Sequence, residues 1–281
     1  MRIFSTYPTF QSFFARQQEQ FIDRIQAVSE PEMIYLLGGS FHREKCESIF
    51  SVQAPTKQYV SAYFLLVLIK EAQGRPLHDL QDRIEQSCKT LTPITAMVME
   101  TATFHEWLNA GNPFASKVTL YANPVYVKDN LPTLPVATAH VSARPERPGR
   151  QGLHKAAELL GAAQLLIHNQ LNNTAAFMLH QACEQSLAEL IKITTGFRSH
   201  THNLDRLLKY ACMVTYELKD VFPKHNEKEI RLFTLLARAY SDTRYQSDYS
   251  ISLHELHQLF ERVTEIYKIA RQTIETIHKN E

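Results

Sequence analysis

Apolar residues recur at helical spacing throughout the second half of the chain. From Leu253 to Ile277 one returns every three or four positions, and Ser252 followed by Glu255 has the form of a capping box. Gly196 is placed to end an earlier helix in a left-handed turn, and Asn173 or Thr174 to cap its start. The spacing predicts an all-α, up-and-down bundle of five helices, over residues 153–170, 173–195, 202–216, 226–240 and 252–278.

The first 130 residues alternate between two patterns. Helical spacing covers residues 11–28, 76–88 and 104–110, while short apolar, β-branched runs predict strands at 34–37, 59–69, 94–99 and 117–127. This alternation favours a small α/β domain. Four prolines then interrupt residues 131–152, where neither a helix nor a central strand can continue. We therefore expect an α+β, two-domain protein with an α/β domain at 1–130, a linker at 131–152 and a helical domain at 153–281.

Composition restricts the choice of function. The formal net charge is +1, so any contact with nucleic acid has to be local. The four cysteines form no CxxC pair, and no zinc site is expected. The N-terminal residues contain no continuous apolar segment typical of a signal peptide, and the longest apolar run, Tyr63–Ile69, is too short to span a bilayer. We expect a soluble cytoplasmic protein without a membrane partner.

Three motifs occur in a distinctive order in the helical half. The second helix carries Phe177 and then the run His180–Glu184, the next turn reads Thr-His-Asn-Leu at 201–204, and Ala239-Tyr240 with Arg244-Tyr245 precedes the last helix. In this order and spacing they resemble the HEPN family over about 125 residues. The resemblance implies a helical bundle that dimerises and binds a nucleotide or RNA.

Polar residues in the second predicted helix suggest where such a ligand would bind. Glu184 and Gln181 lie among apolar neighbours, and a buried carboxylate needs a partner, for which we expect Arg238 or Arg244. His202 is placed to cap or enter the third helix. One interpretation is a purely structural cluster, in which Glu184, His202 and Arg244 satisfy one another's hydrogen bonds and charges and hold the bundle together. The other is a small cleft, with a polar cluster of His180, Gln181 and Glu184 and phosphate contacts from His202, Arg238, Arg244 and Tyr245.

The ribonuclease branch of the family has an arginine and a histidine with four to six residues between them. Here Arg244 and His254 are too far apart, Arg198 and His202 are too close and lie in a turn, and Arg262 has no histidine at that distance. The resemblance is therefore to the non-catalytic branch, and we assign no catalytic residue.

The N-terminal half resembles a polymerase-β-type nucleotidyltransferase where a strand runs into Gly38-Gly39-Ser40. In that family the Gly-Ser pair opens a helix that cradles a triphosphate, and the next strand bears an Asp-x-Asp pair for two Mg²⁺ ions. Ala62 and Phe64 stand at the corresponding positions here, so the resemblance implies a degenerate domain without transfer activity, and Mg²⁺ only if a nucleotide carries it. The alternative is an unrelated α/β domain in which Gly38-Gly39 makes a tight turn.

Three functional hypotheses remain open. The first is a non-catalytic protein that binds a nucleotide or RNA and forms a homodimer. The dimer is expected because the last helix, about 40 Å long at 1.5 Å per residue, is longer than the shorter helices can cover. The second is an enzyme, either a ribonuclease with an atypical Arg/His site or a nucleotidyltransferase with relocated acids. The third is a structural protein that binds a partner encoded in its own operon.

Overall fold

The computed structural model describes residues 15–45, 56–72, 74, 76–129, 149–245 and 249–280. The chain divides into two compact units, residues 1–143 and 144–281. The predicted linker at 131–152 lies outside the described residues up to position 148, and its last four residues already belong to a helix. Along the described residues no helix is both long enough and apolar enough to cross a bilayer.

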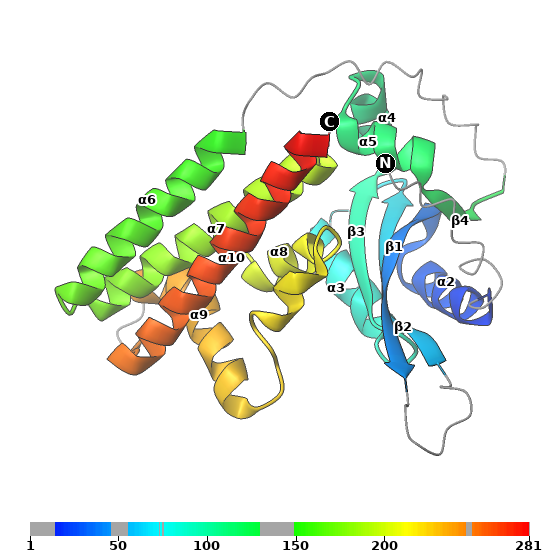
Figure 1. Cartoon of the computed structure of the whole chain (residues 1–281). Helices are drawn as coiled ribbons and strands as arrows, with labels where there is room; N and C mark the ends of the chain where they lie inside the picture. Colours follow the sequence, from blue (N-terminus) through cyan, green and yellow to red (C-terminus); the bar gives the residue numbers. More distant parts are fainter. Residues whose placement is uncertain are drawn as a thin grey trace. The chain divides into compact units, whose positions relative to one another are not determined.

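The N-terminal unit is built on a four-stranded sheet in the order β3-β2-β1-β4 (Figure 1). Its strands are β1 (Pro31–Lys45), β2 (Thr56–Ile69), β3 (Ile94–Glu100) and β4 (Asn123–Val127). The pairs β1–β2 and β1–β4 are antiparallel, whereas β2 and β3 are parallel. The parallel pair is joined by a crossover through α3 (Leu77–Cys88), as expected for a βαβ connection.

One face of this sheet carries the main core of the unit. Helix α2 (Ala15–Ser29) contributes Phe21 and Ile25, which are buried with Ile84 of α3 against apolar residues of β1 and β2. The Phe21 and Tyr63 rings lie 5.1 Å apart. On the other face, Phe104 of α4 (Thr101–Asn109) lies 6.1 Å from the ring of Tyr35. The apolar residues predicted for these strands are thus buried by helices, as an α/β unit requires.

Two predictions for this unit are wrong. Residues 117–121 form the end of helix α5 (Pro113–Tyr121) rather than a strand, because Asn112 caps the helix by accepting hydrogen bonds from the amides of Phe114 and Ala115, and Pro113 occupies its first position. The other concerns Gly38-Gly39-Ser40, which neither turns the chain nor opens a helix, because β1 continues in an extended conformation to Lys45.

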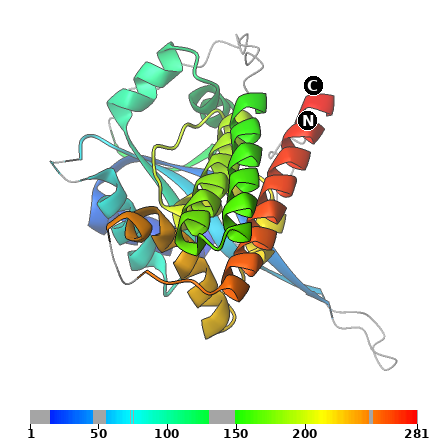
Figure 2. The same ribbon diagram turned by 90° about the vertical axis from the view of Figure 1, so that its left-hand side faces the viewer.

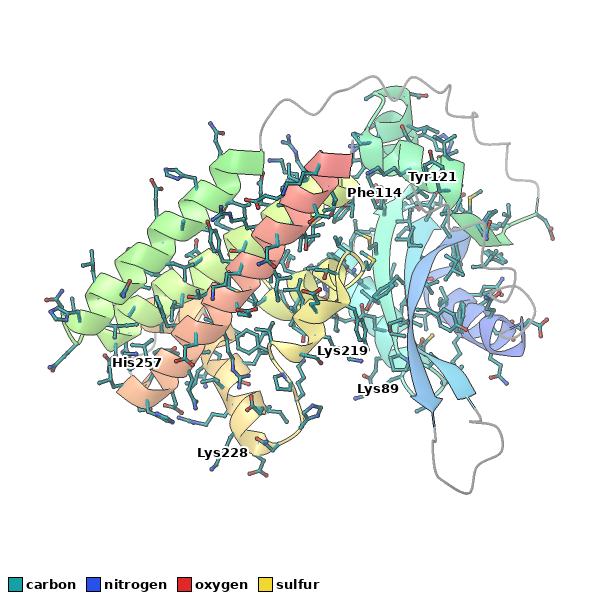
Figure 3. All side chains as sticks on the ribbon, in the orientation of Figure 1. Lys89, Phe114, Tyr121, Lys219, Lys228 and His257 are labelled. Atoms are coloured by element: carbon teal, nitrogen blue, oxygen red, sulfur yellow. The ribbon has the colours of Figure 1, made fainter. Side chains whose placement is uncertain are left out.

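The second unit is entirely helical among its described residues. Helix α7 (Asn172–Thr195) is central, since α6 (Gly149–His168), α8 (Leu204–Ala211), α9 (Glu227–Tyr245) and α10 (Leu253–Asn280) all contact it. Figure 2 shows α6, α7 and α10 running side by side. A short 3₁₀ turn at Tyr216–Asp220 follows α8. Polar residues such as Lys228 and His257 are exposed on the outer surface of α9 and α10 (Figure 3).

The helix ends show which local signals decide the boundaries. Gly196 adopts the predicted left-handed conformation after α7, with φ 83°, and Ser252 and Glu255 form the predicted capping box. The predicted cap of α7 is wrong, because the Asn173 amide binds the Tyr249 carbonyl instead of its own helix end. The third helix is shorter than predicted: it starts at Leu204 behind an Asn203 cap and ends at Ala211.

Candidate functional site

The three residues of the predicted polar cluster of α7 lie together, and two of them, His180 and Glu184, are buried. The side chain of His180 is 1% exposed and that of Glu184 is 11% exposed, and their Nε2 and Oε2 atoms are 3.6 Å apart. The Gln181 amide donates to Glu184 Oε2 at 3.3 Å, and His180 Nδ1 lies 2.9 Å from the carbonyl oxygen of Leu236 on α9. One helical turn of α7 therefore brings these three polar side chains together inside the bundle.

The partner of Glu184 is a histidine rather than the expected arginine. His202, in the segment that leads into α8, places its Nδ1 atom 3.0 Å from Glu184 Oε1. Arg238 instead binds Asp242, one turn along α9, so its predicted pairing with Glu184 is wrong. Arg238 and Asp242 are four residues apart and therefore neighbours along α9, which explains the pairing. The expectation that His202 caps the helix is also wrong, since Asn203 does so.

Tyr240, which the sequence analysis named in a motif but did not assign to the site, is an aromatic member of it. Its ring stacks on the imidazole of His202 at 4.9 Å with an interplanar angle of 12°, and on that of His180 at 5.3 Å and 29°. Phe177 stacks on Tyr240 from 6.3 Å. The available signal was the position of Tyr240 four residues after Leu236, on the face of α9 that meets α7.

The electrostatics of the cluster favour an ionised Glu184. Burial raises the pKa of this carboxyl, but the hydrogen bonds and positive charge of His180 and His202 outweigh it, so the pKa lies below its usual value. Burial also raises the pKa of the neighbouring Cys183 thiol, which stays neutral. The site is therefore a buried negative charge compensated by imidazoles.

Two predicted contacts of this site cannot be placed at side-chain level. Arg244 and Tyr245 lie in α9, which continues five residues beyond its predicted end at Tyr240, and their side chains fall outside the described part. No Gly or Pro interrupts residues 240–245, so nothing in the sequence stops the helix there.

The predicted phosphate loop belongs to the other unit. Gly38 and Ser40 lie directly opposite Phe64 and Ala62 in the β1–β2 register, so the residues at the expected metal-acid positions do neighbour the glycine motif. A methyl group and a phenyl ring offer no oxygen to a cation. Among the described residues, no three His, Cys, Asp or Glu side chains gather in a geometry suited to a metal ion.

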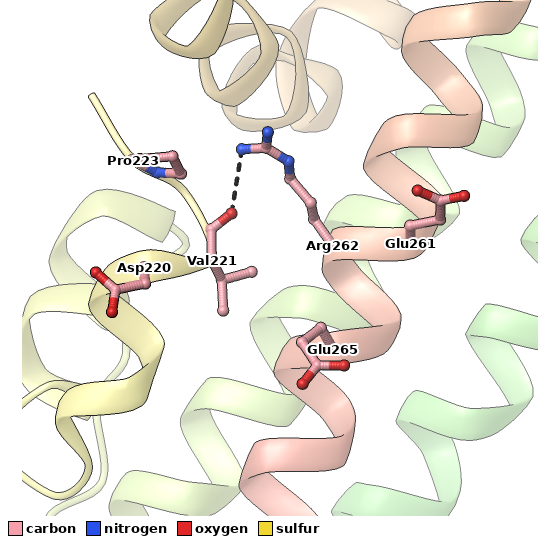
Figure 4. Close-up of a pocket in the computed structure, with 6 residues that line it drawn as sticks. All are labelled: Asp220, Val221, Pro223, Glu261, Arg262 and Glu265. Carbon is pink, nitrogen blue, oxygen red and sulfur yellow. Dashed lines mark hydrogen bonds between the residues drawn. The ribbon is translucent and has the colours of Figure 1, made fainter. Parts of the chain in front are cut away.

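A shallow pocket of about 310 Å³ lies elsewhere in the helical unit, between the segment after α8 and helix α10 (Figure 4). Arg262 lines the pocket, donates a hydrogen bond to the Val221 carbonyl oxygen at 3.1 Å and forms an ion pair with Glu229 at 2.6 Å. Its other charged residues, Asp220, Glu261 and Glu265, are acidic. Since the arginine is already neutralised, this pocket does not favour a phosphate.

Comparison with known proteins relates the helical unit to a known domain family. No curated protein matches the chain. Among solved structures, the crystal structure of TT1696 from Thermus thermophilus is similar at 19% identity and a TM-score of 0.32, over 44% of this chain and 97% of that one. Residues 150–273 match the family model of the HEPN domain, which confirms the resemblance that the motifs around His180, Thr201 and Tyr240 had predicted.

Proposed function

We propose that the helical unit is a non-catalytic binding domain for a nucleotide or RNA, and that it dimerises. The observation that carries the proposal is the state of His202: one ring nitrogen is held by buried Glu184, and its side chain is 57% exposed. An imidazole fixed in this way presents its other nitrogen to a ligand at the surface. The match to the HEPN domain at residues 150–273 supports a nucleic-acid-related ligand.

Isothermal titration of the full chain with nucleoside triphosphates, with and without Mg²⁺, tests this proposal. We expect binding that His202→Gln weakens at least tenfold. The matched control is His200→Gln, which changes an exposed histidine two residues earlier in the same segment. Absence of binding by every nucleotide at millimolar concentration would contradict the proposal.

For the N-terminal unit we propose no nucleotidyl transfer. The support is local: Ala62 and Phe64 face Ser40 and Gly38 across the β1–β2 ladder, where a transferase needs paired carboxylates. Incubation with ATP, Mg²⁺ and an RNA or protein acceptor should yield no labelled product. Transfer of label, abolished by a chelator, would show that acids elsewhere in the chain perform the reaction.

The Glu184–His202 pair favours one alternative, a ribonuclease with an atypical site. A carboxylate that orients an imidazole is the arrangement by which many enzymes position a general base. Incubating the purified chain with total RNA separates the two functions: cleavage that is lost in His202→Gln would replace the binding proposal, and intact RNA agrees with it.

The proposed dimer is supported by apolar side chains at the surface of α6. Leu165 is 67% exposed and Leu171, just after the helix, is 53% exposed. On α10 Leu253 is 47% exposed, but apolar side chains are buried from Leu256 to Ile274, so the length of α10 alone no longer requires a second copy. Sedimentation at micromolar concentration should give twice the monomer mass, and Leu165→Glu should shift it towards the monomer. A monomeric wild-type protein would exclude the dimer.

A further inference from the structure

The orientation of His202 separates its two ring nitrogens into an inner and an outer one. Nδ1 contacts Glu184 Oε1 at 3.0 Å, whereas Nε2 has no hydrogen-bond partner among the residues that the structure describes. With the side chain more than half exposed, the outer nitrogen is accessible to a ligand. A bound group at this position would therefore meet Nε2 first.

Among the side chains that the structure describes, Glu184 is the ion-pair partner of the ring and no lysine or arginine pairs with that carboxylate. Among the described side chains, the titratable groups around it are Glu184 and His180 from α7 and Tyr240 from α9. Gln181, which satisfies the second oxygen of Glu184, is neutral. Tyr240 stacks almost parallel to the imidazole, with an interplanar angle of 12°. Arg238 forms an ion pair with Asp242.

These contacts decide which form of the histidine can accept an anion. A neutral imidazole that donates from Nδ1 to Glu184 presents a lone pair at Nε2, which repels a phosphate oxygen. The protonated ring donates from both nitrogens, to Glu184 on one side and to the ligand on the other. The positive charge then bridges two negative groups.

We infer that His202 is the phosphate contact of the site and that phosphate binding takes up one proton from solvent at its Nε2 atom, with Glu184 holding the resulting imidazolium. This inference rests on the proposed function. The proton balance is one imidazole plus one proton giving one imidazolium, and no covalent bond to the ligand forms or breaks. Affinity must then fall with rising pH, by at most tenfold per pH unit for one linked proton.

The experiment is a calorimetric titration of the full chain at pH 6, 7 and 8, in two buffers of different ionisation enthalpy. One arm uses Mg²⁺-free ATP and the other a single-stranded oligoribonucleotide, which distinguishes a free nucleotide from a nucleic-acid phosphate. Because the terminal phosphate of ATP titrates in the same range, the measured quantity is the difference in proton uptake between wild type and His202→Gln. We expect wild type to take up as much as one proton per ligand more than His202→Gln does. His200→Gln should take up as many protons as wild type.

A second variant tests the role of the carboxylate. Glu184→Gln removes the charge that stabilises the imidazolium, so the pH at which affinity declines should move to a lower value. Should a variant fail to fold, nuclear magnetic resonance of the His202 ring nitrogens in the unaltered chain gives the same information, since ligand addition must raise their protonated fraction.

The outcomes separate this inference from the function on which it rests. Binding with equal pH dependence in wild type and His202→Gln, or a His202 ring whose protonation the ligand leaves unchanged, would overturn the inference while leaving the binding function intact. A chain that binds neither ATP nor the oligoribonucleotide would overturn the proposed function and the inference with it.

Discussion

Glu189 of α7 lies against Gly152 of α6 so closely that a Cβ atom at position 152 would be 2.6 Å from the carboxyl carbon of Glu189. The carboxylate is buried, and Lys192 holds it from one turn further along α7 at 3.3 Å. The close packing of α6 against α7 therefore requires a residue without a side chain at position 152, near the start of α6. Gly161, in the middle of the same helix, has open space around it and provides a direct comparison.

Gly161→Ala should raise the free energy of unfolding by about 0.5–1 kcal/mol, because alanine loses less backbone freedom in a helix. Gly152→Ala should lose this gain, because Glu189 must move to admit the methyl group. Chemical denaturation followed by far-UV circular dichroism measures both. Repeating Gly152→Ala in a Glu189→Ala background should restore the gain, and if it does not, the close approach is not the cause.

The capping box of α10 predicts a specific loss on mutation. The Glu255 amide donates a hydrogen bond to the Ser252 hydroxyl at 3.3 Å, and the Ser252 amide donates one to the Glu255 carboxylate at 3.0 Å. Ser252→Ala should lower the free energy of unfolding by about 1 kcal/mol, and Ser252→Gly by only a few tenths. Equal losses in both variants would show that the cap does not hold this helix start.

Arg262 fixes the segment that leads into α9. Besides Val221 and Glu229, its guanidinium lies 5.5 Å from the ring centroid of Phe222. Since the ion pair is only about three-quarters buried, Arg262→Gln should cost about 1–2 kcal/mol. Arg271→Gln is the control on the same helix, because Arg271 pairs with the exposed Glu275. The melting temperature of this variant should equal that of wild type. A double-mutant cycle with Glu229→Gln isolates the pair.

The lowered pKa of Glu184 makes the helical unit sensitive to acid. Because the folded-state pKa lies below the ordinary value of 4.5, the stabilisation is complete above that value and is lost as the pH falls through the folded-state pKa. Denaturation curves at pH 6 and pH 3.5 should differ more for wild type than for Glu184→Gln. The single tryptophan, Trp107, belongs to the N-terminal unit, so its fluorescence transition is the internal control. Identical pH dependence in both proteins would contradict this account.

The local signals succeeded or failed for identifiable reasons. Gly196 predicted a helix end correctly, because a left-handed residue after a helix is a property of a few adjacent positions. The expected strand at 117–127 failed because its apolar run was weighed without the Asn112-Pro113 start that turns its first part into α5. Gly38-Gly39 suggested a turn, yet pairing with β2 keeps both glycines extended.

The sequence by itself determined that the second half is a bundle of amphipathic helices with polar residues at His180 and Glu184, because apolar periodicity and caps act within a few residues. Only the tertiary structure decided that Glu184 meets His202 rather than an arginine, and that Tyr240 stacks on the same imidazole. These partners come from α7, α9 and the segment before α8. Their meeting depends on how each helix is rotated about its axis, which the packing of the whole core sets and no local pattern records.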